Sequence, residues 1–392
     1  MSKVDQAIQG YAVPDRLPPA ALVLTGCVGV IGSNSLVLGP IAPEVATSFA
    51  TGVPAVMAAS SAFGIGTAAS ALFLARHIDR LGARRMLRLA MTLLAAALFL
   101  SAVSPVVAAL VAAQSLAGIA SGVALPAIYA SAAAVAQPGR EGRVIGVVLT
   151  GWTLSMVAGV ALSAVLADMV HWRAVYVAVA LLAALATVVL STMAFRDAPK
   201  TGSAPMPFAA LRLRGVKPLL VACGAFMASF YGVYGYLGDH LHHGLGHPIS
   251  MNGLAALLYG IGFGGSMLLD GIADRLGARR LMPLAFLAVA AVYLAFALFA
   301  GSTTAVLAII FLWGLANHFG LNMLIMRLTA IDPAQRGTIM GLNSAVTYLA
   351  VFLGTSGFGP LYANYGFAVC AFVAMGLTLL AALAGSASSQ AD

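Results

Sequence analysis

Residues 79–85 read Asp-Arg-Leu-Gly-Ala-Arg-Arg, and the same seven residues return at 274–280. The two copies lie 195 residues apart, which is half the length of the 392-residue chain. The same displacement pairs further prolines and glycines: Pro138 with Pro333, Gly142 with Gly337, and Gly146 with Gly341. A period of half the chain indicates that the protein consists of two related repeats.

The composition around these motifs is that of a membrane protein. Hydrophobic residues make up 61% of the chain and charged residues only 8%, against about a quarter charged in a soluble domain. A spanning helix needs roughly 20 apolar residues. Because hydrocarbon offers the backbone no hydrogen-bond partner, we predict an all-α polytopic membrane protein with twelve transmembrane helices, whose cores lie at 20–43, 53–75, 87–104, 106–134, 144–167, 172–195, 217–239, 250–270, 281–300, 303–327, 338–361 and 366–385.

The positive charges predict the topology. If the N-terminal tail lies in the cytoplasm, only Arg173 of the 20 Lys and Arg residues falls outside. Cytoplasmic loops are rich in Lys and Arg, so we expect an integral protein of the bacterial inner (plasma) membrane type with both termini in the cytoplasm. The first nineteen residues contain no short apolar core with a cleavage site, which indicates a tail rather than a signal peptide.

The domain organisation follows from these runs. Between the sixth and seventh runs lies a segment with several charges, three prolines and a Gly-Ser pair, which we interpret as a linker. Six helices per repeat give both repeats the same orientation, so an axis along the membrane normal relates them. The expected organisation is a tail (1–19), a six-helix bundle (20–195), a cytoplasmic linker (196–216), a second bundle (217–385) and a C-terminal tail (386–392).

The duplicated motif resembles the loop after the second and eighth helices in transporters of the major facilitator superfamily. The likeness is greatest to the twelve-helix drug:proton antiporter and sugar-efflux branch, in which the motif has the form G-x-x-x-D-R-x-G-R-R. Here Ala75 and Asp270 replace the first glycine. The resemblance covers the whole chain and implies two pseudo-symmetric six-helix bundles, alternating access, coupling to protons and a functional monomer.

The motif residues are the candidate gating loops. An acid can bind the positive end of a neighbouring helix, a glycine allows a tight turn, and arginines stay at lipid headgroups. The resemblance implies that Asp79 contacts the chain near Thr338 when the cytoplasmic side is shut, and that Asp274 does so near Val144. The alternative is that the arginines only anchor the topology. The candidates are Asp79, Arg80, Gly82, Arg84, Arg85, Asp274, Arg275, Gly277, Arg279 and Arg280.

Two positions depart from the antiporter pattern. The fourth helix of that branch carries an Arg four residues before a Gly, whereas Gln114 precedes Gly118 here. The fifth helix carries a G-x-x-x-G-P-x-x-G-G motif, whereas residues 151–163 contain no proline. Both departures favour an uptake symporter or a facilitator as the alternative to an antiporter.

His318 is the one ionisable residue predicted to lie deep in the membrane. It is 15 residues from the start and 9 from the end of the tenth run, well inside the span. Intramembrane ionisable groups are costly and usually functional, and a histidine titrates near physiological pH. We therefore consider His318 a proton-coupling candidate, with a neutral, hydrogen-bonded histidine as the alternative.

Other polar and aromatic residues are candidates for a substrate cavity. Each could instead form a hydrogen bond between helices. Because the set has no carboxylate and no arginine, it suits a neutral or amphipathic small molecule better than a cation or a multivalent anion. The candidates are Asn34, Gln114, Trp152, Tyr231, Tyr234, Asn317, Asn322, Asn343 and Tyr348.

Glu44 and Asp239 occupy matched positions at the outer ends of the first and seventh runs. They are candidates for an external proton site or gate, with simple solvation as the alternative. Beside Asp239, four histidines fall within residues 240–247. They could bind a metal or sense pH, or form a solvated loop, and we predict no metal site there.

The remaining patterns limit the function. The glycine run at 260–265 lies in an apolar helix, which favours close helix packing over a phosphate loop. No phosphate loop with a lysine, nucleophile elbow or metalloprotease helix occurs, so we predict neither an enzyme nor a cofactor. The scattered basic residues do not indicate nucleic acid. We expect proton-coupled efflux of a drug, sugar or metabolite across a lipid bilayer. A non-transporting membrane sensor is the alternative from another class.

Overall fold

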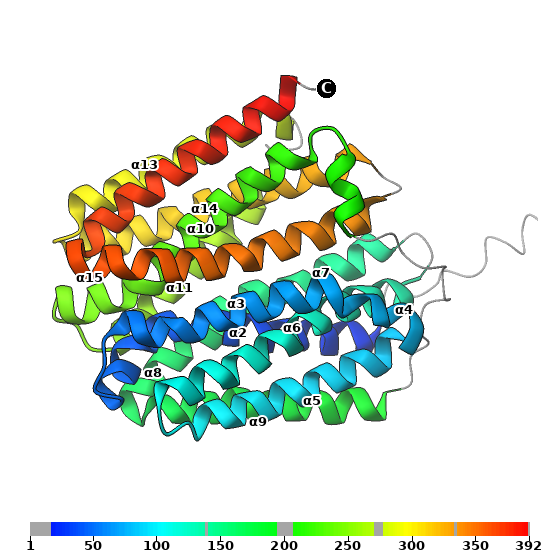
Figure 1. The fold of residues 1–392 in the computed structure, drawn as a ribbon, viewed down its shortest axis with the longest axis horizontal. Coiled ribbons are helices and arrows are strands. Elements are labelled where there is room, and N and C mark those ends of the chain that lie inside the picture. The colour runs from blue at the N-terminus through cyan, green and yellow to red at the C-terminus, as the bar shows by residue number, and fades with distance from the viewer. Residues whose placement is uncertain (1–16, 138–139, 194–206, 270–276, 333–334, 391–392) are drawn as a thin grey trace, which may run out of the picture.

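A computed structural model of the chain describes residues 17–137, 140–193, 207–269, 277–332 and 335–390. Within these ranges the regular elements are all helices (Figure 1). The first half contains α2 (Pro19–Ser48), α3 (Val53–Phe73), η1 (Ala75–His77), α4 (Ile78–Leu81), α5 (Ala83–Ala102), α6 (Val107–Val135), α7 (Glu141–Leu154), η2 (Ser155–Val160), α8 (Ala161–Met169) and α9 (Trp172–Thr192). The second half contains η3 (Pro207–Arg212), α10 (Val216–Asp239), η4 (His240–Gly244), α11 (Ser250–Gly265), η5 (Ser266–Leu269), α13 (Ala278–Phe299), α14 (Thr303–Ile331) and α15 (Arg336–Gln390).

Eleven of the described helical segments are long and apolar enough to span a membrane. The last of them, in α15, is long enough for two crossings. The helix turns back at Gly366, whose positive φ of 78° a residue with a side chain rarely adopts. The fold therefore has the twelve predicted crossings, and runs 338–361 and 366–385 form the two limbs of α15 on either side of Gly366.

The fifth predicted run, 144–167, is also not a single regular helix. It consists of α7, the π-helical segment η2 and α8, which follow one another without a break. Such π-helical segments are rare and occur often at functional sites. This segment lies in the middle of the run and contacts α2 and α11.

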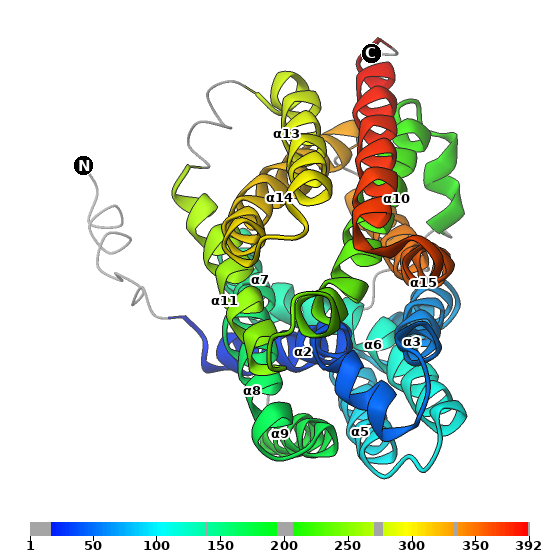
Figure 2. The same cartoon turned by 90° about the vertical axis from the view of Figure 1, so that its left-hand side faces the viewer.

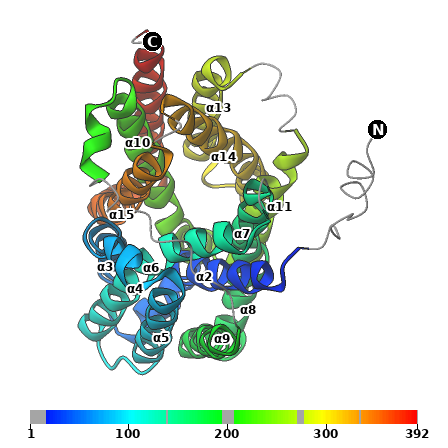
Figure 3. The ribbon, with the colours of Figure 1, turned by 90° about the vertical axis from the view of Figure 1, so that its right-hand side faces the viewer.

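Helices α2 to α9 pack together, and helices α10 to α15 pack together. Figures 2 and 3 look at this arrangement from its two ends. The two groups meet through three helix pairs: α3 with α15, α2 with α10, and α11 with the η2–α8 segment. Each of these pairs contains one helix from each sequence repeat.

Small residues allow the helices within each half to approach closely. A methyl group placed on Gly66 of α3 would lie 2.7 Å from the Ser115 carbonyl oxygen of α6. In the second half, Gly262 and Gly314 come closer still to the facing backbone of α14 and α11. Without a hydrophobic force between helices in lipid, such contacts supply packing energy. The glycine run at 260–265 therefore packs helices, as predicted.

The glycines of the two duplicated motifs adopt the same backbone conformation. Gly82 has φ 86° and ψ 140°, and Gly277 has φ 81° and ψ 138°. Each glycine immediately precedes a long helix, α5 or α13, so the repeated letters give repeated geometry. We call the end of the molecule that carries these loops the arginine-rich end, defined by Arg84, Arg85, Arg279, Arg280 and Arg336.

Candidate functional site

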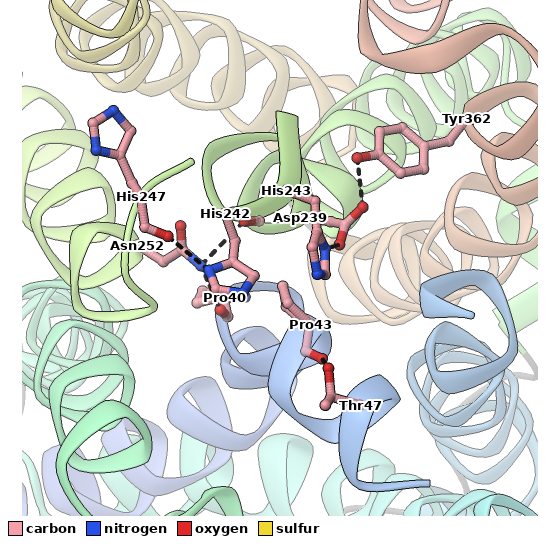
Figure 4. Close-up of polar contacts among 10 residues, drawn as sticks. Pro40, Pro43, Thr47, Asp239, His242, His243, His247, Asn252 and Tyr362 are labelled. Carbon is pink, nitrogen blue, oxygen red and sulfur yellow. Dashed lines mark hydrogen bonds and ion pairs between the residues drawn. The ribbon is translucent and has the colours of Figure 1, made fainter. Parts of the chain in front are cut away.

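The two halves are joined by hydrogen bonds at the end opposite the arginine-rich end. Asn252 at the start of α11 donates from Nδ2 to the Pro40 carbonyl oxygen of α2 at 2.7 Å and to the Gly238 carbonyl oxygen at 3.2 Å (Figure 4). On the other side of the molecule, the hydroxyls of Ser61 in α3 and Thr355 in α15 are 2.7 Å apart. We call these contacts the closed gate.

Close packing extends from the closed gate toward the middle of the molecule. A methyl group on Gly253 would lie 2.6 Å from the Ala161 carbonyl oxygen, and one on Gly64 would lie 2.8 Å from the Tyr348 carbonyl oxygen. Both contacts cross between the halves. No side chain larger than hydrogen fits at either glycine without a shift of the helices.

At the arginine-rich end, glycines of the interface helices have open space beside them. Among the described residues, a methyl group on Gly142 or Gly146 of α7 would meet nothing within 4 Å, and the same holds for Gly337 and Gly341 of α15. The close contacts named above therefore lie toward the opposite end, and these four glycines take no part in them.

Aromatic residues of the second half lie where the halves converge. Tyr234 of α10 packs against α2, because a methyl group on Gly39 would lie 3.3 Å from its ring. Phe230 contacts the rings of Tyr231, Tyr234, Tyr259 and Trp313 at centroid distances of 5.0–5.6 Å. The predicted candidates Tyr231 and Tyr234 thus belong to a buried aromatic cluster at the interface. Tyr348 lies edge-on to Phe63 of α3 across the interface.

Asn317 and His318 of α14 face neighbouring aromatic residues of α11. Asn317 donates from Nδ2 to the Tyr259 hydroxyl at 3.1 Å, and its buried Oδ1 has no partner. His318 is 8% exposed and lies edge-on to Phe263, with ring centroids 5.1 Å apart. The next residue of α11, Gly264, packs against Thr153 of the first half. His318 therefore contacts a helix that meets the first half.

Asn34 and Gln114, two further cavity candidates, bind each other. Their side-chain amides exchange two hydrogen bonds of 3.1 and 3.2 Å between α2 and α6. Gln114 also donates to the Ser101 hydroxyl of α5 at 3.0 Å. All three side chains are buried, so this group joins three helices inside the first half.

The remaining cavity candidates are spread over three helices. Trp152 of α7 is half-buried and packs against Gly32 of α2. Asn343 of α15 is buried, and its Oδ1 has no hydrogen-bond partner. Asn322 of α14 is half-buried, one turn toward the arginine-rich end from His318.

The two matched carboxylates have different surroundings. Glu44 accepts a hydrogen bond from the Trp172 backbone nitrogen at 2.8 Å and so caps the first turn of α9. Asp239 accepts from the Tyr362 hydroxyl at 2.6 Å and pairs with Nδ1 of His243 at 2.6 Å (Figure 4). Asp239 is buried, whereas the His243 side chain is 57% exposed.

The other three histidines of the 240–247 segment bind different partners. His240 lies 2.8 Å from the Ala300 carbonyl oxygen, His242 lies 2.6 Å from the His247 carbonyl oxygen, and His247 lies 2.7 Å from the Thr303 hydroxyl. Among the described residues, no group of three His, Cys, Asp or Glu side chains is arranged to hold a metal ion. The histidines instead hold the segment against α13 and α14.

The structure describes most of the first candidate gating loop, and the second from Gly277 onward. Gly82 and Gly277 form the turns described above, and Arg80, Arg85, Arg279 and Arg280 are exposed at the arginine-rich end, with Arg84 half-buried. The Asp79 side chain, Asp274 and Arg275 lie outside what the structure describes. A cavity of about 620 Å³ lies at this end, lined by residues that include Arg214, Arg279, Arg327 and Asp332.

Sequence reasoning missed Tyr259 and Trp313, which are central to the aromatic cluster. No motif singles them out, because both lie within ordinary apolar runs. In the structure, the contact of Gly118 with the Phe63 carbonyl oxygen recurs as that of Gly314 with the Tyr259 carbonyl oxygen, so Tyr259 takes the place of Phe63. The halves share one backbone plan, and the aromatic cluster belongs to the second half.

Comparison with known proteins gives the family. The sequence matches the Major Facilitator Superfamily over residues 24–355. It is 28% identical over 369 residues to the uncharacterized MFS-type transporter YwfA of Bacillus subtilis (strain 168), covering 92% of this chain and 89% of that protein. It is also 28% identical over 372 residues to a chloramphenicol resistance protein of Streptomyces lividans, covering 89% of this chain and 93% of the relative.

Solved structures share the fold. A bacterial homolog of the human lysosomal transporter Spinster, in an inward-facing and occupied conformation, superposes with a TM-score of 0.76 at 16% identity, over 95% of this chain and 96% of that one. A D-xylose-proton symporter also gives a TM-score of 0.76 at 16% identity, over 93% and 95% of the two chains. With the family match spanning most of the sequence, the chain belongs to the Major Facilitator Superfamily of membrane transporters.

Proposed function

We propose that the protein exports a small neutral or amphipathic organic molecule in exchange for protons, by alternating access. The observation that carries this proposal is the asymmetry of the interface. Its helices touch around Gly64 and Gly253, whereas Gly146 and Gly341 have no described neighbour within 4 Å. A transporter needs such a state and its mirror image, in which the contacts and the opening exchange ends.

The orientation of this state follows from the positive charges. Cytoplasmic loops are rich in arginine, and the open end carries the two arginine motifs. We infer that the structure faces the cytoplasm, with both termini on that side, and that the closed gate faces outward. A solute would then enter from the cytoplasm and reach the aromatic cluster.

The side chains at the convergence of the halves support an uncharged solute. Tyr231, Tyr234 and Tyr348 supply aromatic surface, while Asn317 and Asn343 each have a buried oxygen without a hydrogen-bond partner. Rings bind apolar or planar parts of a ligand, and a few polar groups orient it. The chloramphenicol resistance relative supports export of an organic compound and suggests chloramphenicol as the first probe.

His318 is the proposed proton carrier. It is buried and contacts Phe263 of α11, a helix that meets the first half. A movement of α11 against the first half would therefore change the surroundings of His318. A histidine titrates in the range in which bacterial proton gradients operate.

The test is transport in proteoliposomes with an imposed pH gradient. We expect radiolabelled chloramphenicol to accumulate only when protons flow down their gradient in the opposite direction. His318→Ala should abolish this dependence, while downhill exchange of chloramphenicol persists. His171→Gln is the matched histidine control. Its side chain accepts a backbone hydrogen bond at the start of α9, which glutamine can also accept, so coupling should be unchanged.

Coupled transport that survives in His318→Ala would remove this residue from the proton pathway. Solute movement without any response to the gradient would instead identify a facilitator. One observation favours that alternative, or an uptake symporter. Gln114 stands where antiporters carry an arginine, and its uncharged amide supplies no charge for coupling. This amide is hydrogen-bonded to Asn34 and Ser101.

A further inference from the structure

A small cavity lies directly behind the closed gate. Its volume is about 20 Å³, and it lies between Pro40 of the first half and residues of α10, η4, α11 and α14 in the second. Asn252, whose amide nitrogen binds the Pro40 carbonyl oxygen, lines this cavity. The cavity therefore adjoins the hydrogen bond that closes the gate.

Three polar side chains line the cavity with hydrogen-bonding capacity left over. Tyr234 is 7% exposed and Asn252 is 2% exposed, and neither the Tyr234 hydroxyl nor Asn252 Oδ1 has a hydrogen-bond partner. The Tyr259 hydroxyl accepts a hydrogen bond from Asn317 and keeps its own hydrogen to donate. The three residues come from two helices, α10 and α11.

Size and chemistry together specify the occupant. A cavity needs about 10–15 Å³ of this kind of volume to hold one water molecule, and a buried water needs two to four polar partners. This cavity meets both conditions and is too small for an organic solute. Buried polar atoms without a protein partner are uncommon in native proteins, and an ordered water molecule often binds those that occur.

We propose that one ordered water molecule binds in this cavity and forms part of the closed gate. It donates a hydrogen to Asn252 Oδ1 and accepts the phenolic hydrogens of Tyr234 and Tyr259. Both ends of the Asn252 amide are then satisfied: Nδ2 by the Pro40 and Gly238 carbonyl oxygens, and Oδ1 by the water. The amide plane is thereby fixed in the orientation that joins the halves.

The water also gives the gate a polar centre that is already hydrated. When the halves separate at this end, bulk water can join the bound molecule without first entering a dry, apolar space. The site does not depend on which solute the protein carries, so it stands apart from the proposed transport function.

Radiolytic footprinting tests the proposal on the intact, detergent-solubilised protein. Ionised bound water produces hydroxyl radicals that oxidise adjacent side chains, even buried ones, within microseconds. We expect the rate of Tyr234 oxidation, read by mass spectrometry, to exceed that of Tyr176 at least several-fold. Tyr176 is 1% exposed and lies outside the cavity lining. Equal rates for the two tyrosines would overturn the proposal.

A radical scavenger separates bound water from bulk water. Oxidation of the exposed Tyr365, which is 68% accessible, should fall as the scavenger concentration rises, whereas oxidation of Tyr234 should persist. Scavenger sensitivity of Tyr234 equal to that of Tyr365 would show access from bulk solvent and contradict a bound molecule.

A cavity-filling variant provides the second measurement. Ala256 lines the cavity and is buried, so Ala256→Val should displace the water and lower Tyr234 oxidation to the level of Tyr176. Ala180→Val, in α9 and away from the cavity, is the matched control and should leave Tyr234 oxidation unchanged. Undiminished oxidation in a folded Ala256→Val protein would refute the site, and the measurement on the unaltered protein stands if that variant does not fold.

Discussion

The amide pair of Asn34 and Gln114 shows how a polar residue can be used inside this membrane protein without any contact to a solute. Each amide satisfies the other, and Ser101 takes the remaining donor of Gln114. Because all three side chains are buried, water cannot replace a lost partner. Their role is therefore to hold α2, α5 and α6 together.

This arrangement predicts a stability change for Gln114→Leu. The variant leaves the Asn34 amide buried without a partner, at a cost of about 1–3 kcal/mol, and should lower the melting temperature in detergent. The double variant Asn34→Leu with Gln114→Leu removes both polar groups and should recover part of the loss. A double variant less stable than the sum of the two single changes would contradict the pairing.

Some residues of the candidate site could be predicted from the sequence and others could not. Residue type and depth are enough to single out His318 and Asn317, because charged and amide groups are rare in apolar runs. They do not reveal Tyr259 or Trp313, since aromatic residues are as common in a core as in a binding site. Nor do they show that Asn34 faces Gln114, which depends on how α2 crosses α6.

At the scale of the helix, the two motif glycines fix the start of α5 and α13. Gly82 and Gly277 both have φ above 80°. Combined with ψ near 140°, this conformation costs a residue with a side chain about 1–3 kcal/mol, so Gly82→Ala and Gly277→Ala should lower the melting temperature to a similar extent. The matched control is Gly265→Ala, at a helical glycine whose added methyl group meets nothing within 4 Å. An unchanged melting temperature in both motif variants would show that the turns relax without cost.

Gly146 of α7 and Gly341 of α15 predict that larger side chains at these positions hold the protein in the observed conformation. Gly146 and Gly341 have open space around them, so leucine fits in the observed conformation. If these faces meet when the arginine-rich end closes, Gly146→Leu and Gly341→Leu should abolish transport while solute binding, measured by tryptophan fluorescence, persists. Gly376→Leu, on the same open-space criterion but near the end of the chain, is the control. Normal turnover in Gly146→Leu would show that α7 does not make the closing contact.

Helix boundaries were predictable to within a few residues, because charges and prolines mark the ends of apolar runs. The interruption of the fifth run by η2 was not, since no residue in 155–160 forces a π-helical turn by itself. Its cause lies in packing, where Gly159 and Ser155 lie against Ser33 and Gly32 of α2. The turn of α15 at Gly366 likewise depends on backbone geometry rather than on hydropathy.

For the whole molecule, the asymmetric interface predicts opposite distance changes at its two ends. Spin labels at Gly142→Cys and Gly337→Cys should report a shorter distance on addition of a transported solute, and labels at Thr51→Cys and Pro248→Cys a longer one. The three native cysteines are buried, so background labelling should be low. Distances that shorten or stay constant at both ends would contradict alternating access.

The whole fold was the most predictable level, because the motif repeat, twelve apolar runs and the arginine distribution all required the same arrangement. The conformation that the structure adopts was not predictable. It depends on whether the halves make contact at the closed gate or at the arginine-rich end, and the sequence contains residues suited to both.

The confinement of the aromatic cluster to one half has a consequence for how such a chain can change over generations. Phe230, Tyr231, Tyr234, Tyr259 and Trp313 all belong to the second repeat. After a gene duplication, the second copy can change these side chains while the first copy keeps the contacts between the halves. Changing the solute preference of this protein should therefore need mutagenesis of the second half of its gene, centred on Tyr234, Tyr259, Trp313 and Asn317.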